Sequence, residues 1–255
     1  MPPKPSPPRL THFLCIPLIT PVSRPQLQRS LTNFRDKCSR VRTSDLPDGI
    51  PDQAIRPLGT LHLTLGVMSL LTEERVQSAL KVLNELNLRD LLSTTASASE
   101  NLEKKDVLEP PQLDITLRGL ISMHSKVKTS CLYTAPFDPT GQLYSFCLKL
   151  RDIFTAANIL VPENTGRPLL LHATILNTVY VPGVRGRGSG QGHGHGKNRA
   201  KLTIDATELL EEYEDFEWMK DVRVDTVAIC RMGAKKGEGR SGEESYVVEG
   251  EVSMP

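Results

Sequence analysis

The chain has 255 residues, of which 38% are hydrophobic and 24% are charged, and this suits one globular domain or two small lobes packed together. Its formal net charge of +1 argues against a protein that coats chromatin or duplex nucleic acid through a broad basic surface. Any contact with nucleic acid is therefore expected in a local pocket. No run reaches the roughly 18–20 apolar residues that a membrane span needs, so no membrane contact is expected.

The N-terminal region lacks the pattern of a secretory signal. Its apolar stretch, residues 13–19, is short, is broken by Pro17 and is not followed by the small residues of a cleavage site. The five cysteines form no C-x-x-C pair, which favours reduced thiols over a disulfide framework. We therefore expect an intracellular protein, nuclear and/or cytoplasmic.

The first half of the chain predicts a tail followed by alternating strands and helices. Residues 1–10 are rich in proline and are expected to be disordered. Leu27, Leu31 and Phe34 recur at helical spacing. The elements expected in chain order are a strand at 11–18, a helix at 24–40, a loop at 43–57, a strand at 60–70, a helix from Thr72 with Val76, Leu80, Leu83 and Leu86 on one face, and a linker at 93–110.

The second half repeats this order of elements. A glycine-rich insert at 183–200 is expected to be flexible. The other elements expected are strands at 112–120 and 127–134, a helix at 140–157, a strand at 167–181, a helix at 205–215, and strands at 221–231 and 245–253. The pattern predicts a mixed α/β (α+β) chain with two sheets, which form a single domain over residues 11–253.

Two apolar strands each carry a histidine followed two positions later by a threonine: His62 and Thr64 in the first, His172 and Thr174 in the second. Because side chains alternate between the faces of a strand, the two polar groups of each motif point the same way. Two such strands in adjacent sheets would bring four polar groups to one cleft. The motif is short, and the alternative interpretation is two core histidines that each bond a nearby threonine.

This set of side chains suits the cleavage of a phosphodiester. Imidazole has an ordinary pKa of about 6.5, so at neutral pH one histidine can accept a proton and the other can donate one. The threonine hydroxyls would donate hydrogen bonds to the non-bridging phosphate oxygens, where charge grows in the transition state. His62, Thr64, His172 and Thr174 are therefore the predicted catalytic residues, with no metal and no cofactor. The pattern leaves open which histidine is the base.

The two H-x-T motifs resemble the signature of the two-histidine (2H) phosphoesterases. Three segments, THFLCIPL at 11–18, GTLHLTLGVMSLL at 59–71 and LLLHATILNT at 169–178, look like the 2′,5′-RNA-ligase-like domain of A-kinase anchor protein seven. The segments 205–233 and 245–252 look more like the phosphoesterase domain of activating signal cointegrator complex subunit one. The resemblance implies a two-lobed, pseudo-symmetric fold in which two antiparallel sheets line a central cleft with helices outside.

The resemblance also implies an activity. It points to a metal-independent phosphodiesterase or cyclic phosphodiesterase that acts on RNA ends or 2′-linked oligonucleotides. The alternative is a non-catalytic subunit that binds RNA or a nucleotide in a transcription-cofactor or repair complex, and a weaker one is a scaffold whose segments 1–10 and 183–200 recruit partners. The expected partners are an RNA end or a nucleotide substrate and, in a cofactor complex, other proteins.

Residues that contact the rest of the substrate are harder to select. A nucleotide cleft usually needs an aromatic ring or an arginine to stack on a base. Arg167, just before the second motif, and Tyr133 are the predicted substrate-binding residues, with Phe137 and Tyr180 as further aromatic candidates. His193 and His195 lie on the glycine-rich insert, but two ligands there are too few for a structural zinc site, so no metal site is expected.

Overall fold

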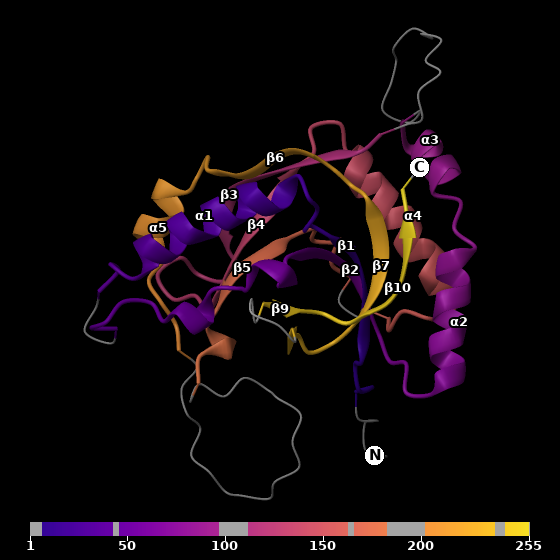
Figure 1. The fold of residues 1–255 in the computed structure, drawn as a ribbon, viewed down its shortest axis with the longest axis horizontal. Coiled ribbons are helices and arrows are strands. Elements are labelled where there is room, and N and C mark those ends of the chain that lie inside the picture. Colours follow the sequence, from indigo (N-terminus) through magenta and orange to yellow (C-terminus); the bar gives the residue numbers. More distant parts are fainter. Residues whose placement is uncertain are drawn as a thin grey trace, which may run out of the picture.

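The computed structural model describes residues 7–42, 46–96, 112–162, 166–182, 202–237 and 243–254 (Figure 1). Residues 1–6 of the expected tail, most of the expected linker and the expected insert at 183–200 lie outside this part of the chain. Residues 7–10 are exposed and have no regular secondary structure. None of the described helices is long and apolar enough to cross a membrane.

Two antiparallel four-stranded sheets form the centre of the molecule, and the mixed α/β prediction is confirmed. The strand order in the first sheet is β10 (Val248–Ser253), β7 (Thr226–Arg231), β1 (His12–Pro17) and β2 (His62–Met68). The order in the second sheet is β6 (Glu217–Arg223), β3 (Asp114–Ser122), β4 (Cys131–Phe137) and β5 (Ala173–Asn177). Separately, β8 (Lys235–Lys236) pairs with β9 (Glu244–Ser245).

Helices cover the sheets from two sides. The α-helices of the described residues are α1 (Ser23–Cys38), α2 (Glu73–Asn84), α3 (Leu88–Ala96), α4 (Gln142–Ala156) and α5 (Thr207–Glu212). In Figure 1, α1 and α5 lie on one side of the central strands, and α2, α3 and α4 lie on the other. Short 3₁₀ turns, η1 (Asp52–Ala54), η2 (Leu58–Thr60) and η3 (Thr178–Tyr180), connect the strands near the site described below.

The local sequence determines where the helix α2 begins and which of its faces is buried. Thr72 caps its N-terminus, since the hydroxyl accepts a hydrogen bond from the Arg75 N–H at 3.4 Å. Val76 and Leu83 are buried, whereas Leu80 is half-buried on the same apolar stripe. This stripe packs against β10 and β7. The helix predicted from Thr72 is confirmed, but it ends at Asn84, so Leu86 lies beyond it.

Each sheet contains one strand–helix–strand unit, and each unit sends its helix to the other sheet. In the first unit β1 pairs with β2, but the connecting helix α1 packs on β6 of the second sheet. In the second unit β4 pairs with β5, but α4 packs against β2 of the first sheet. The strands β2 and β5 occupy matching edges of their sheets and contact each other. The two helices therefore connect the two sheets, and the two strands that follow them, β2 and β5, lie side by side.

The chain between residues 217 and 231 crosses from one sheet to the other. The sequence predicts a single strand at 221–231, and this prediction is wrong: β6 pairs with β3 in the second sheet, whereas β7 pairs with β1 and β10 in the first. Between them, Val224 is buried, and its N–H donates to the Leu113 carbonyl oxygen at 2.9 Å. A strand of apolar residues has the same hydrophobic pattern in either sheet, so the sequence does not indicate where the chain crosses from one sheet to the other.

Two other predicted boundaries also differ from the structure. The strand expected at 167–181 is paired only over β5, because Pro168 cannot donate a ladder hydrogen bond and residues 178–180 turn into η3. The linker expected from residue 93 is wrong for its first residues, which end α3. Leu88, Leu92 and Thr95 are buried at helical spacing, and their packing extends the helix through a segment rich in serine and threonine.

A large hydrophobic core lies between the sheets and the helices, and a small second cluster of Phe13, Cys15, Ala228 and Cys230 is separate from it. Trp218 on β6 is fully buried; its Nε1–H donates to the Gly119 carbonyl oxygen at 2.9 Å, and its ring meets Phe34 of α1 with ring centroids 5.3 Å apart. The apolar neighbours of the H-x-T residues belong to this core: Leu61, Leu63, Leu65, Leu171, Ala173 and Ile175 are all buried. The alternation predicted for the two motif strands is therefore confirmed.

Leu63 lies between His62 and Thr64, and its side chain is fully buried. Leu63→Ala should lower the free energy of unfolding by about 2–5 kcal/mol, because it leaves a cavity in the core. Urea denaturation followed by circular dichroism measures this change. The control is Leu71→Ala, at a residue that is 63% exposed, where the change should stay within about 0.5 kcal/mol. Equal losses in the two variants would contradict the role of Leu63 in the core.

Candidate active site

The four residues of the H-x-T motifs line one cavity of about 180 Å³, here named the H-x-T cavity. His62 and Thr64 lie on β2, Thr174 lies on β5, and His172 immediately precedes β5. The structure thus brings together the four residues that the sequence predicts to be catalytic, while their catalytic role stays a prediction. The other described residues that line the cavity are Arg56, Thr60, Asn177, Tyr180 and Tyr246.

The two imidazoles are held in the same way. His62 Nδ1 lies 2.8 Å from the Thr60 carbonyl oxygen, and His172 Nδ1 lies 2.9 Å from the Leu170 carbonyl oxygen. Each histidine thus bonds the residue two positions before it. Because a carbonyl oxygen only accepts, each Nδ1–H is the donor, and Nε2 is the nitrogen left for chemistry.

Aromatic rings pack around both imidazoles. Phe13 of β1 lies tilted against His62 with ring centroids 4.7 Å apart, and Tyr246 meets His62 edge to face at 5.2 Å. Tyr133 of β4 meets His172 edge to face at 5.4 Å. These contacts restrict the rotation of both imidazoles and keep the two Nε2 atoms in fixed directions.

Burial lowers the pKa of His62 from 6.5 to about 4. Loss of solvent around the imidazole is the largest cause; the positive charge of Arg56 and the neighbouring His172 act in the same direction, and the hydrogen bond to Thr60 opposes them. His62 is consequently neutral at neutral pH, with Nε2 free to accept a proton. The hydrogen bond of His172 to Leu170 is exposed, whereas that of His62 is partly buried. The two matched imidazoles therefore sit in unequal surroundings.

Arg56 places a buried positive charge at the cavity. The residue is 6% exposed, its guanidinium carbon lies 4.0 Å from the centroid of the Tyr180 ring, and Nη2 donates to the Tyr246 hydroxyl at 3.3 Å. Within the described ranges no carboxylate pairs with Arg56. A buried cation without a counter-ion is costly. A phosphate in the cavity would supply that counter-ion, and the planar guanidinium suits its oxygens.

Sequence reasoning missed Arg56 because it assigned residues 43–57 to a loop. Backbone contacts hold this part of the loop against the second sheet: Ile55 forms an antiparallel bridge with Leu176 of β5, and the Arg56 N–H donates to the Ile175 carbonyl oxygen at 2.8 Å. The available signal was an arginine between an isoleucine and a proline in an otherwise polar stretch. Tyr246, which contacts both Arg56 and His62, was missed as well.

The predicted substrate-binding residues have different places in the structure. Arg167 is exposed and is not among the described residues that line the H-x-T cavity, because the irregular chain of residues 168–171 separates it from His172. Tyr133 is buried and packs on His172 without lining the cavity. Phe137 is exposed at the end of β4, and only Tyr180 of the aromatic candidates lines the cavity. Arg56, and not Arg167, is therefore the arginine that lines the H-x-T cavity among the described residues.

The described residues contain no group of three or more His, Cys, Asp or Glu side chains that could hold a metal ion. His193 and His195 lie outside the described residues. Catalysis without a metal therefore remains a prediction, which a chelator tests directly.

Several solved structures resemble this chain. A crystal structure described as a phosphoesterase is 14% identical, with a TM-score of 0.49, over 96% of this chain and 98% of that chain. LigT of E. coli complexed with 3′-AMP is 14% identical, with a TM-score of 0.48, over 96% of this chain and 98% of that chain. TT0787 of Thermus thermophilus is 14% identical, with a TM-score of 0.45, over 96% of this chain and 97% of that chain.

The family comparison matches residues 10–254 to the AKAP7 2'5' RNA ligase-like domain. This range contains Arg56 and both H-x-T motifs, together with β2 and β5. Comparison with curated proteins found no significant match. Because the family model covers nearly the whole chain, the protein belongs to the AKAP7 2'5' RNA ligase-like domain family, within the two-histidine (2H) phosphoesterases.

Proposed function

We propose that this protein is a metal-independent phosphodiesterase or cyclic phosphodiesterase that acts on RNA ends or 2′-linked oligonucleotides by two-histidine acid/base catalysis. The observation that carries the proposal is the matched pair of imidazoles at one cavity, each with Nδ1 engaged and Nε2 available. The buried charge of Arg56 supports a phosphate as the ligand. Membership of the family supports phosphoesterase chemistry in general.

In the proposed reaction His62 is the base, because its lowered pKa keeps it neutral. A water molecule attacks the phosphorus, and His62 Nε2 takes one proton from that water. The bond between phosphorus and the departing ribose oxygen breaks, and His172, which enters this step as the imidazolium with a proton on both ring nitrogens, donates its Nε2 proton to this oxygen. The water is thereby added across the broken bond, and each proton transfer contributes roughly 10²–10⁴-fold to the rate.

The phosphate oxygens need donors as negative charge grows on them. Among the described residues neither the Thr64 nor the Thr174 hydroxyl makes a side-chain hydrogen bond, so both are available to a ligand. Arg56 adds charge-assisted hydrogen bonds to the same oxygens. Donors held in place before the substrate arrives stabilise the transition state without reorganising.

His62→Ala and His172→Ala should each lower kcat/KM by about a hundredfold or more, because each removes one proton transfer. Hydrolysis is measured in EDTA on a 2′,5′-linked oligoadenylate, a 2′,3′-cyclic nucleotide and a 3′,5′-linked RNA end. The control is His124→Ala, an exposed histidine that does not line the cavity. Activity that disappears in EDTA, or that persists in both histidine variants, would contradict the proposed mechanism.

The His62 imidazole should titrate at about pH 4 in the folded protein, and NMR of its ring protons measures this. The unfolded chain binds this proton near its ordinary pKa of 6.5. Protonation therefore favours unfolding, and the stability that neutral His62 provides above pH 6.5 is lost as the pH falls through about 4. In His62→Gln this loss should be smaller. A His62 titration near 6.5 would rule out the buried, neutral base.

Arg56→Gln should lower kcat/KM by about a hundredfold, because it removes a positively charged donor from the phosphate oxygens. The control is Arg29→Gln on the exposed face of α1, which should retain the parent kcat/KM. Circular dichroism verifies that both variants fold. Parent-like kinetics in Arg56→Gln would show that the phosphate binds elsewhere.

The unpaired charge of Arg56 also favours a second candidate function, since it would hold a phosphate without any reaction. The protein would then be a non-catalytic RNA- or nucleotide-binding subunit of a transcription-cofactor or repair complex. Tight nucleotide binding without turnover between pH 5 and 8 would favour this function over the enzyme.

A further inference from the structure

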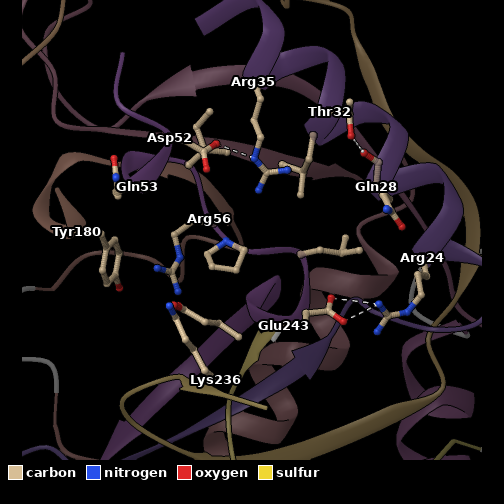
Figure 2. Close-up of a pocket in the computed structure, with 15 residues that line it drawn as sticks. Arg24, Gln28, Thr32, Arg35, Asp52, Gln53, Arg56, Tyr180, Lys236 and Glu243 are labelled. Atoms are coloured by element: carbon tan, nitrogen blue, oxygen red, sulfur yellow. Dashed lines mark hydrogen bonds and ion pairs between the residues drawn. The ribbon is translucent and has the colours of Figure 1, made fainter. Parts of the chain in front are cut away.

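A second cavity, here named the α1 groove, shares Arg56 and Tyr180 with the H-x-T cavity. Its volume is about 900 Å³. Figure 2 shows its walls: one face of α1, from Arg24 to Arg35, lies above it, and Lys236 and Glu243 lie below it. The segment 55–58, which leads into β2, also lines the groove.

The volumes of the two cavities indicate that different parts of one ligand would lie in each. The H-x-T cavity, at about 180 Å³, is smaller than the roughly 300–1,000 Å³ of pockets that enclose small-molecule ligands. It has room for the reacting phosphate and the nearest sugar atoms, and the rest of a nucleotide must lie outside it. A chain whose phosphate sits beside His62 and His172 can pass Arg56 and Tyr180 into the α1 groove, because both residues belong to both cavities.

Two of the cations that line the α1 groove are already neutralised. Arg24 Nη1 donates to both carboxylate oxygens of Glu243, at 2.9 and 3.1 Å. Arg35 Nε donates to Asp52 at 2.9 Å. Both ion pairs are drawn in Figure 2, at the wall formed by α1 and at the edge near Glu243. These two exposed pairs leave little net charge at their part of the groove.

The remaining cations are Arg56 and Lys236, opposed by one lining carboxylate, Glu244. Neither Arg56 nor Lys236 forms an ion pair with a carboxylate of the described chain. In Figure 2 the side chain of Lys236 extends toward that of Arg56. Like charges directed at one another repel, and an anion between them would turn this repulsion into attraction on both sides.

The groove also offers surfaces for a nucleobase. Arg56 covers one face of the Tyr180 ring, and the tyrosine is 49% exposed, which leaves ring surface available for stacking. Leu58 adds apolar surface, and the amides of Gln28 and Gln53 line the same space. An inorganic anion would need only the cations. The combination of cations, an aromatic ring and amides suits a nucleotide that is joined to the reacting phosphate.

We propose that the α1 groove binds the nucleotides next to the scissile phosphate, so that the substrate is an oligonucleotide whose next phosphate lies between Arg56 and Lys236. This proposal rests on the proposed function and names its substrate class. The protein then selects oligonucleotides over mononucleotides, because binding energy from the groove is added only when a second phosphate is present.

The test compares 2′,5′-linked adenylates of two and four nucleotides on the full chain. Lys236→Gln removes the ammonium group, and the matched control is Lys235→Gln, at the adjacent exposed residue that does not line the groove. In the parent, kcat/KM should be about tenfold higher for the tetranucleotide. Lys236→Gln should reduce this ratio about fivefold through KM, as expected for one lost phosphate contact, and Lys235→Gln should leave it unchanged.

A binding measurement separates this proposal from the proposed function. Fluorescence anisotropy of a labelled tetranucleotide on the His62→Ala/His172→Ala variant needs no turnover. Adding Lys236→Gln should reduce the slope of log Kd against log salt concentration by about 0.7, the value for one phosphate contact on a single strand.

The outcomes are distinct. Histidine-dependent turnover with equal kcat/KM for both lengths, or equal effects of the two lysine variants, overturns the groove proposal and leaves the proposed function standing. No turnover on any substrate, together with tetranucleotide binding that Lys236→Gln alone weakens, supports the groove and overturns the enzymatic function.

Discussion

The backbone contact between residues 55–56 and β5 determines the geometry around both cavities. It ties the segment that leads into the first sheet to the edge strand of the second, through the Ile55–Leu176 bridge and the Arg56 N–H donating to the Ile175 carbonyl oxygen at 2.8 Å. The same contact carries the Arg56 guanidinium to the boundary between the H-x-T cavity and the α1 groove. The position of the Arg56 charge relative to both histidines thus depends on two main-chain interactions.

Burial has opposite consequences for two ionisable groups that line the H-x-T cavity, His62 and Arg56. Removing water from His62 keeps its imidazole neutral, which suits a base. Arg56 stays charged because guanidinium does not lose its proton in proteins. Its contacts with Tyr180 and Tyr246 compensate only part of the lost solvation. The fold therefore maintains a neutral imidazole next to a cation, an arrangement that costs stability.

Sequence patterns predicted the parts that depend on local periodicity. The α2 helix follows from its cap at Thr72 and its apolar stripe, and the facing of His62 and Thr64 follows from strand alternation. The α3 helix was missed because packing of Leu88 and Leu92 outweighs weak local propensity. The crossing between β6 and β7 was missed because the periodicity of a strand does not indicate which of the two sheets it joins. Arg56 was missed because its role comes from contacts with β5.

The sequence by itself determined the class of fold, most of the helices and strands, and the two H-x-T pairs with their shared facing, because these depend on residues a few positions apart. Only the tertiary structure decided that β2 and β5 meet at matching edges, that Arg56 rather than Arg167 lines the H-x-T cavity, and that the α1 groove shares Arg56 and Tyr180 with this cavity. These features join residues more than a hundred positions apart, and such contacts depend on how helices cross to the opposite sheet, which no local pattern encodes.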